Sequence, residues 1–241
     1  MKLVVANWKM NPQNAVQAKK LATDIDRGLS KRSRIATVIC PPFVFLPAVK
    51  PAVSSAKLGS QDLAPHEGIP LTGGISASQL KGFGVSYVIV GHSERRALGE
   101  TDQQVNQKIR QALKHKIEPV VCVGFGTRKN DSAASIKKVV ASQIKKGLAG
   151  IPKSRLTIAY EPVWAISRGL GTGTAVEPEH AADIIGFIKK LVSPARGIYG
   201  GSLDAKNVGD FAAQKVIQGG LVGGASLQPS EFLKIVKAFE N

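Results

Sequence analysis

The stretch PVVCVGFGTRKNDSAASIKKVVASQIKKGLAGIPKSRLTIAY, residues 119–160, decides the fold class of this 241-residue chain. It begins with an apolar, β-branched run at 119–124 and ends with another at 156–160. Both runs are continuous rather than alternating, which is typical of strands covered on both faces in a parallel sheet. Between them, four apolar residues recur at helical spacing: Ile136, Val140, Ile144 and Leu148. The stretch therefore predicts two parallel strands joined by a helix.

The same alternation extends to both ends of the chain. Further short apolar runs lie at 3–7, 36–40, 57–61, 86–91, 197–201 and 219–224. The run at 57–61 is the weakest, and the helices after the second and third runs are faint. Eight strands with intervening helices predict an α/β fold, a single (β/α)8 barrel domain over residues 1–241, close to the usual length of about 250. A doubly wound open sheet is less favoured, because no G-x-G-x-x-G turn follows the first strand.

Composition excludes several classes of protein. No apolar run approaches the roughly 18 residues of a membrane span, and the first residues lack the long apolar region of a signal peptide. We therefore expect a cytoplasmic protein with no membrane partner. The two cysteines, Cys40 and Cys122, sit in strand-like runs and are expected to be buried free thiols rather than a disulfide or metal site.

The chain is strongly basic, with a formal net charge of +16. Its lysines are mostly scattered pairs on helical stretches, which indicates a solvated surface. Aromatic residues make up 5% of the chain, too few for an interleaved base-stacking surface, so nucleic acid is not an expected partner. A positive field would speed the arrival of an anionic small substrate.

In a (β/α)8 barrel, functional residues lie where the strands end. The first strand ends in ANWKMN, and Asn7 and Lys9 are two apart, so both point to one face. The fourth ends in VGHSERR, which contains His92, and the sixth ends at Glu161. Aromatic and proline neighbours should partly desolvate the Glu161 carboxylate and raise its proton affinity, which suits a general base.

Glycine-rich segments follow the seventh and eighth strands: YGGS at 199–202 and VGGAS at 222–226. Glycine lets main-chain N–H groups approach an anion closely, and a helix start adds attraction for negative charge. Barrels often bind phosphate at these two positions. The pair of segments predicts a phosphate-binding site.

Six motifs carry a resemblance to a known family: NWKMN, GHSERR, VCVG, AYEPVWAI, YGGS and LVGGASL. In order and spacing, over nearly the whole chain, they resemble the triosephosphate isomerases. The resemblance implies interconversion of dihydroxyacetone phosphate and glyceraldehyde 3-phosphate, a step of glycolysis and gluconeogenesis, with no metal or organic cofactor. A small phosphorylated triose is then the expected partner.

The resemblance also implies roles for the matched residues. Glu161 matches the base, and His92 the neutral electrophile that polarises the carbonyl. Lys9 matches the cation that offsets phosphate and enediolate charge, Asn7 a donor to substrate oxygens, and Glu94 a buried partner near Lys9. These five residues form the expected catalytic set.

The phosphate cradle matches Ser202, Gly223 and Gly224, and the glycine-rich run after Trp164 matches a lid. The family follows AI with GTGK, whereas this chain has the longer SRGLGTGT. Counting from the Trp164 hinge places Ser167 at the phosphate-facing position, and matching the glycines places Gly171 there. Both alternatives stay open.

Two further departures concern charge. The family motif TGE reads TGG at 72–74, so Gly74 replaces an acid that pairs with an arginine of the neighbouring subunit, matched here by Arg95. Thr72 still matches the residue that reaches the partner's site, so we expect a homodimer through this loop. Phe125 replaces the acid of VCVGE.

Two other functions compete with isomerisation. A barrel sugar-phosphate lyase or aldolase would share the phosphate cradle but needs a Schiff-base lysine inside the barrel. Apart from Lys9, no lysine ends a strand, and Lys57 begins one. A non-catalytic basic barrel that binds polyanions is opposed by the intact set of Asn7, Lys9, His92 and Glu161.

Overall fold

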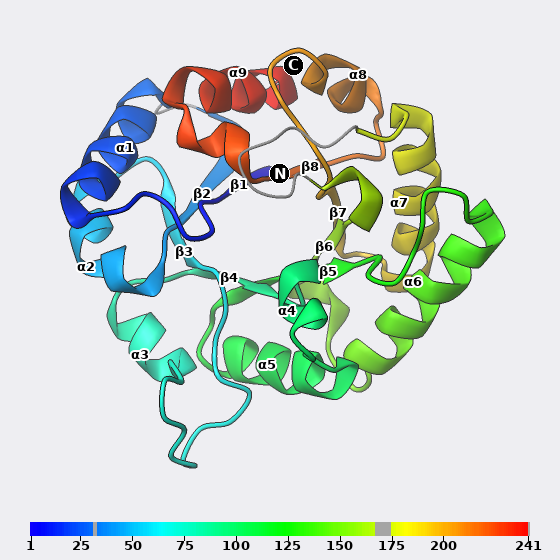
Figure 1. Cartoon of the computed structure of the whole chain (residues 1–241), viewed down its shortest axis with the longest axis horizontal. Coiled ribbons are helices and arrows are strands. Elements are labelled where there is room, and N and C mark those ends of the chain that lie inside the picture. The colour runs from blue at the N-terminus through cyan, green and yellow to red at the C-terminus, as the bar shows by residue number, and fades with distance from the viewer. Residues whose placement is uncertain (31–32, 167–174, 241) are drawn as a thin grey trace.

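A computed structural model of the chain describes residues 1–30, 33–166 and 175–240. Eight parallel strands pair in chain order and close into a barrel, which confirms the predicted fold class. Helices surround the barrel (Figure 1). The strands are β1 Lys2–Asn7, β2 Ile35–Cys40, β3 Lys57–Ser60, β4 Tyr87–Val90, β5 Glu118–Val123, β6 Thr157–Tyr160, β7 Arg196–Tyr199 and β8 Gly219–Val222.

The helices vary in length, and their lengths explain which of them the sequence reveals. The segments after β2 and β3 form helices of only four and six residues, too short to show a helical period. The described helices are α1 Ala15–Gly28, α2 Leu46–Val49, α3 Ala77–Gly82, α4 Ser93–Ala97, α5 Asp102–Lys114, α6 Ala133–Gly147, α7 Pro178–Val192, α8 Val208–Ala213 and α9 Pro229–Glu240.

The barrel closes where β8 meets β1, with Leu3 opposite Gly219. Gly219 has a φ of +141°, and a Cβ built on it would lie 1.7 Å from the Leu3 carbonyl oxygen. Only glycine fits this close approach of two backbones. The ring of strands therefore depends on a residue without a side chain at its last joint.

Two apolar layers hold the fold together. One fills the barrel interior and includes Leu3, Val38, Ile89, Val120 and Leu221. The other lies between the strands and the helices, where the faces predicted from helical periodicity are buried. Because strands contribute to both layers, all six residues of β2 are buried, which explains the continuous apolar runs. Both cysteines are free and buried, as predicted.

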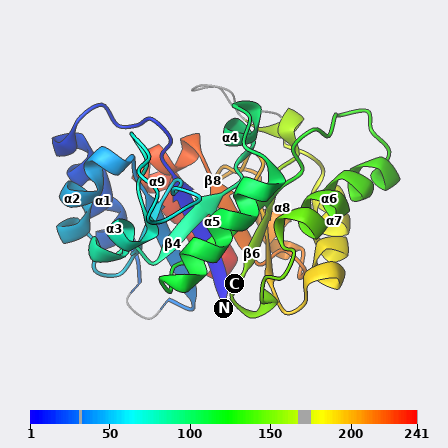
Figure 2. The ribbon, with the colours of Figure 1, turned by 90° about the horizontal axis from the view of Figure 1, so that it is seen from below.

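The two ends of the barrel differ. The strands finish beside α4 at one end, here called the carboxyl end, and both chain termini lie at the opposite, amino end (Figure 2). Connections at the carboxyl end are the βα loops, which carry the predicted site. Within the described ranges, none of the helices has both the length and the apolarity to cross a membrane.

Candidate active site

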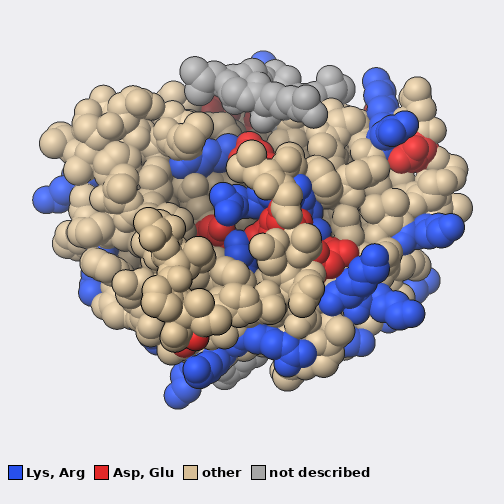
Figure 3. All heavy atoms as spheres, turned by 60° about the horizontal axis from the view of Figure 1, so that its bottom comes forward, with Lys and Arg blue, Asp and Glu red and all other residues tan. Residues whose placement is uncertain are grey.

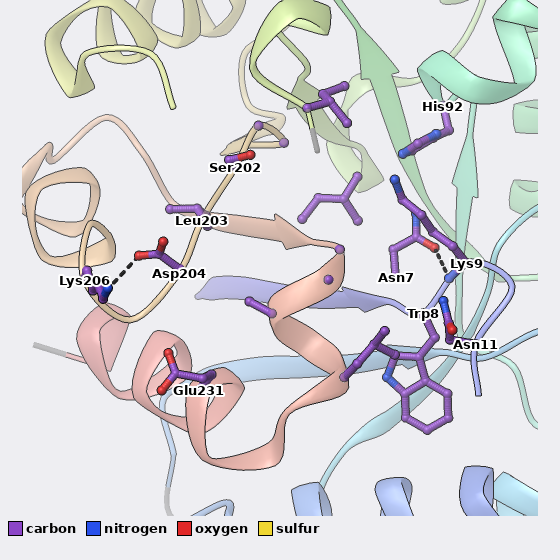
Figure 4. Close-up of a pocket in the computed structure, with 18 residues that line it drawn as sticks. Asn7, Trp8, Lys9, Asn11, His92, Ser202, Leu203, Asp204, Lys206 and Glu231 are labelled. Carbon is purple, nitrogen blue, oxygen red and sulfur yellow. Dashed lines mark hydrogen bonds between the residues drawn. The ribbon is translucent and has the colours of Figure 1, made fainter. Parts of the chain in front are cut away.

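The carboxyl end holds a cavity of about 330 Å³. Asn7, Lys9 and His92 line one side of it, and Ser202 and Lys206 lie at the other (Figure 4). The groups come from the ends of β1, β4 and β7, so closure of the barrel brings together residues that are far apart in the chain. The predicted residues Gly223 and Gly224, after β8, also line the cavity.

Lys9 is held in an unusual backbone conformation, with a φ of +53°. Its amide donates to Asn7 Oδ1 at 3.1 Å, and its carbonyl accepts from Gln61 Nε2 at 2.8 Å. The same Gln61 amide donates to the Cys40 carbonyl at 3.0 Å, which ties the loop after β1 to the end of β2. These contacts hold a conformation that is unfavourable for a residue with a side chain.

His92 is positioned by the helix that it begins. Its Nδ1 accepts the Glu94 main-chain N–H at 3.2 Å, so Nδ1 is the unprotonated nitrogen and Nε2 carries the hydrogen of the neutral ring. The Glu94 carboxylate lies 3.6 Å from Nδ1, beyond hydrogen-bonding distance. The Nε2 atom lies 3.1 Å from Oε1 of Glu161. The geometry supports a neutral imidazole that donates through Nε2.

Glu161 is 1% exposed. Its Oε2 accepts the Ser93 main-chain N–H at 2.8 Å, so the carboxylate is directed toward the start of α4. Burial, and then the neighbouring Glu161 charge, raise the pKa of the Cys122 thiol, which keeps that sulfur protonated. Glu161 itself does not line the cavity, but it adjoins His92, which does.

The prediction that Glu94 is buried is wrong for the single chain. Its carboxylate lies 2.7 Å from Lys9 Nζ, as a partner of Lys9 should, but the side chain is 55% exposed. Glu94 stands in the first turn of α4, at the edge of a smaller cavity of about 160 Å³ that Phe43, Gln61 and Arg95 also line. No described part of the chain covers this edge.

The comparisons with known proteins agree with this arrangement. A sequence model described as triosephosphate isomerase matches residues 2–239. The chain is 40% identical to the triosephosphate isomerase of Idiomarina loihiensis, over 98% of this chain and 97% of the relative. It is 39% identical to that of Carboxydothermus hydrogenoformans, over 97% of each.

The chain belongs to the triosephosphate isomerase family. The residues predicted to form a phosphate cradle, Ser202, Gly223 and Gly224, all line the cavity of this family member. The Ser202 amide donates to the Ala165 carbonyl at 2.9 Å, so it links the cradle to the segment after β6. Gly223 lies close to Lys9: a Cβ built on Gly223 would be 3.6 Å from Lys9 Cε. The lid candidates Ser167 and Gly171 lie outside the described residues.

Sequence reasoning missed several residues around the site of this triosephosphate isomerase family member. Arg95, matched to an intersubunit pair, contacts Asp62 of its own chain at 3.1 Å. Asp62 also contacts Lys108 at 2.5 Å, and Lys108, which is 4% exposed, pairs with Glu100 as well. Lys108 looks like a surface lysine in the sequence, and no local signal marks it as buried.

A second missed group packs around Trp164, just after β6. His180 on α7 approaches the Tyr160 hydroxyl with Nε2 at 3.2 Å, and its ring meets that of Trp164 edge-on at 6.3 Å. Burial lowers the pKa of His180, so the neutral ring is favoured. Trp164 thus packs beside the ring of His180, which in turn adjoins that of Tyr160.

Proposed function

We propose that this chain interconverts dihydroxyacetone phosphate and D-glyceraldehyde 3-phosphate, with Glu161 as the base. The observation that carries the assignment is the 3.1 Å approach of Glu161 Oε1 to His92 Nε2, two groups from separate strands beside one cavity. The Glu161 carboxylate removes a proton from the carbon next to the carbonyl. The resulting enediolate receives the proton back on the neighbouring carbon, so no atom is gained or lost.

His92 completes this chemistry. Since Nδ1 accepts a main-chain hydrogen bond, Nε2 can donate to the carbonyl oxygen as negative charge develops on it. Lys9 Nζ lies at the same wall and offers a fixed positive charge to the enediolate and the phosphate. Asn7, at the end of β1, adds a neutral amide to this wall.

Binding of the phosphate is assigned to Ser202 on the far side of the cavity and to Gly223 and Gly224, which follow β8. Glycines at the ends of adjacent strands allow main-chain amides to approach a dianion. Ser167 or Gly171 of the lid is proposed to add one more amide. A water-poor site strengthens these contacts and protects the enediolate from losing phosphate.

The roles are tested with Glu161→Gln in a coupled isomerase assay. Loss of general-base catalysis lowers kcat by about 10²–10⁴-fold. Glu179→Gln, an exposed glutamate on α7 outside the cavity, is the matched control and should retain wild-type turnover. Unchanged kcat in folded Glu161→Gln removes this residue from the mechanism.

The lyase or aldolase alternative is tested by borohydride trapping in the presence of substrate. Lys9 Nζ already contacts the Glu94 carboxylate at 2.7 Å, whereas a Schiff base requires a free amine directed at the substrate carbonyl. We expect no covalent adduct. An adduct on Lys9 would support the lyase.

We also propose that the barrel, one domain over residues 1–241, works as a homodimer in the cytoplasm. The loop between β3 and α3 extends beyond the ring of helices (Figure 1) and carries the exposed Thr72. Large apolar side chains are exposed on the loops after β1 to β4: Met10, Val44, Ile69, Leu71 and Leu98. An apolar surface of this kind marks a protein–protein interface.

A second copy would cover this surface and the open edge at Glu94. Sedimentation velocity should give twice the chain mass of 25.5 kDa. Leu98→Glu should shift the protein toward monomer and lower its activity. Phe83→Glu is the control: Phe83 caps the C-terminal end of α3, away from these loops, so this variant should stay dimeric and active. A wild-type monomer with full activity contradicts the proposal.

A further inference from the structure

Cationic side chains surround the amino end of the barrel, opposite the active site. For seven of the eight strands, a lysine or arginine stands at the first strand residue or within four residues before it. These residues are Lys2, Arg34, Lys57, Lys116, Lys153, Arg196 and Lys215. Figure 3 shows Lys and Arg side chains gathered along the lower edge of the surface, which is the side of the amino end.

Helix dipoles explain only part of this charge. The helices also finish at the amino end, and several have basic last turns, such as Arg27 of α1, Lys114 of α5 and Lys146 of α6. Cations there stabilise the negative ends of the helix dipoles. This reason concerns the last turns of helices, so it does not apply to the lysines that begin strands.

The acidic groups near this end leave most of the strand-entry charge uncompensated. Glu118 pairs with Arg196 at 3.2 Å, and the Asp26 carboxylate accepts the main-chain amides of residues 54–56. Within the described ranges, no carboxylate lies within ion-pair distance of Lys57 or Lys215. At the carboxyl end, by contrast, Lys9 has an acidic partner.

The arrangement of these charges identifies the kind of partner. Because the strands form a closed ring, their first residues form a ring too, spread over one end of the molecule. A broad, flat anionic surface can contact all positions of such a ring at the same time. A nucleic acid duplex contacts a stripe rather than a ring, and the low aromatic content offers a single strand no base-stacking surface.

We propose that the amino end of the barrel binds the surface of anionic lipid bilayers, peripherally and without insertion. This revises the expectation from sequence that the chain has no membrane partner. The active-site cavity then faces away from the bilayer and stays open to solution. The proposed dimer surface also lies on carboxyl-end loops, so dimerisation leaves the amino end accessible.

The experiment is co-sedimentation of the full chain with lipid vesicles. Vesicles that contain phosphatidylserine should bind the protein at low ionic strength, and pure phosphatidylcholine vesicles should not. Binding should weaken steeply as salt rises, since each interaction is screened beyond a Debye length of about 10 Å at 0.1 M. Bound enzyme should keep its isomerase activity.

A charge-matched pair of variants locates the surface. Lys57→Gln, Lys116→Gln and Lys215→Gln together remove three charges from the amino end, and should weaken binding to phosphatidylserine vesicles by roughly 100-fold. The control carries three glutamines at exposed lysines nearer the carboxyl end, Lys19, Lys129 and Lys138, which leaves the same net charge. The control should bind within about threefold of wild type.

Both variants should show wild-type circular dichroism and isomerase activity, which separates the test from loss of fold and from the proposed function. Equal loss of binding in the two variants would overturn the proposal, because net charge alone would then explain it. Binding of duplex DNA in preference to phosphatidylserine vesicles at equal salt would also overturn it.

Discussion

Replacing Gly200 by alanine tests how closely the fold holds the proposed base. Gly200 follows β7 directly, and its amide donates to the Tyr160 carbonyl at 2.7 Å. A Cβ on Gly200 would lie 2.9 Å from Glu161 Cγ and 3.2 Å from the Tyr160 carbonyl oxygen. Ordinary contacts begin near 3.4 Å, so the Glu161 side chain has to move by about 0.5 Å.

The expected loss of activity follows from this displacement. A misplacement of about 1 Å in a catalytic group costs roughly 100-fold in rate, so half of that corresponds to about tenfold in kcat, or about 1.4 kcal/mol in the activation barrier. The KM should change little, because the added methyl group contacts the proposed base, Glu161, rather than the proposed phosphate-binding residues.

The assay is steady-state isomerase kinetics with a matched glycine elsewhere. Gly209 is an exposed residue of α8, and nothing lies within 4 Å of a Cβ built there. Gly209→Ala should keep wild-type kcat and should raise Tm slightly, because alanine favours the helix. Wild-type kcat in a folded Gly200→Ala enzyme would refute the idea that this contact positions Glu161.

Three further substitutions follow from the same contacts. Asp26 is 8% exposed; burial raises its pKa, but hydrogen bonds from the amides of residues 54–56 outweigh this and lower it. Its contribution to stability is therefore present above the unfolded pKa, near 3.9, and is lost as pH falls through the lower folded value. Asp26→Asn should reduce the free energy of unfolding at pH 7 by about 2–3 kcal/mol and by less in acid, as urea titrations would show; an equal loss at both pH values contradicts this. Gly219→Ala should prevent barrel closure, because its Cβ would overlap the Leu3 carbonyl, and a soluble variant with wild-type Tm would contradict the strand register. His92→Gln should lower kcat by about 10²–10⁴-fold with native circular dichroism, and undiminished turnover would exclude His92 as the electrophile.

The barrel could be predicted from sequence because its strands are buried on both faces. Runs such as 119–124 stay apolar at every position, a pattern that is typical of strands in a covered parallel sheet. Strand ends were less accurate: the predicted run 57–61 ends at Ser60, and Gln61 turns away to hold Lys9. The exact residue at which a strand ends and the backbone turns cannot be read from the types of the residues around it.

Site residues could be predicted from sequence where a single local motif contains them. Asn7, Lys9 and His92 line a common cavity as expected. Residues whose roles depend on distant neighbours were not predictable. Lys108 is buried only because Asp62, from another loop, and Glu100 meet it in space, and no spacing in the sequence encodes that meeting. The 55% exposure of the Glu94 side chain likewise depends on the packing of distant segments, which no local motif encodes.

The left-handed backbone at Lys9 has a consequence for evolution in the laboratory. A lysine in this region of φ and ψ is less stable than glycine by about 1–2 kcal/mol. A screen that rewards heat resistance alone should therefore enrich glycine or asparagine at this position. Such survivors would melt later and turn over substrate poorly, because the ammonium group would be gone.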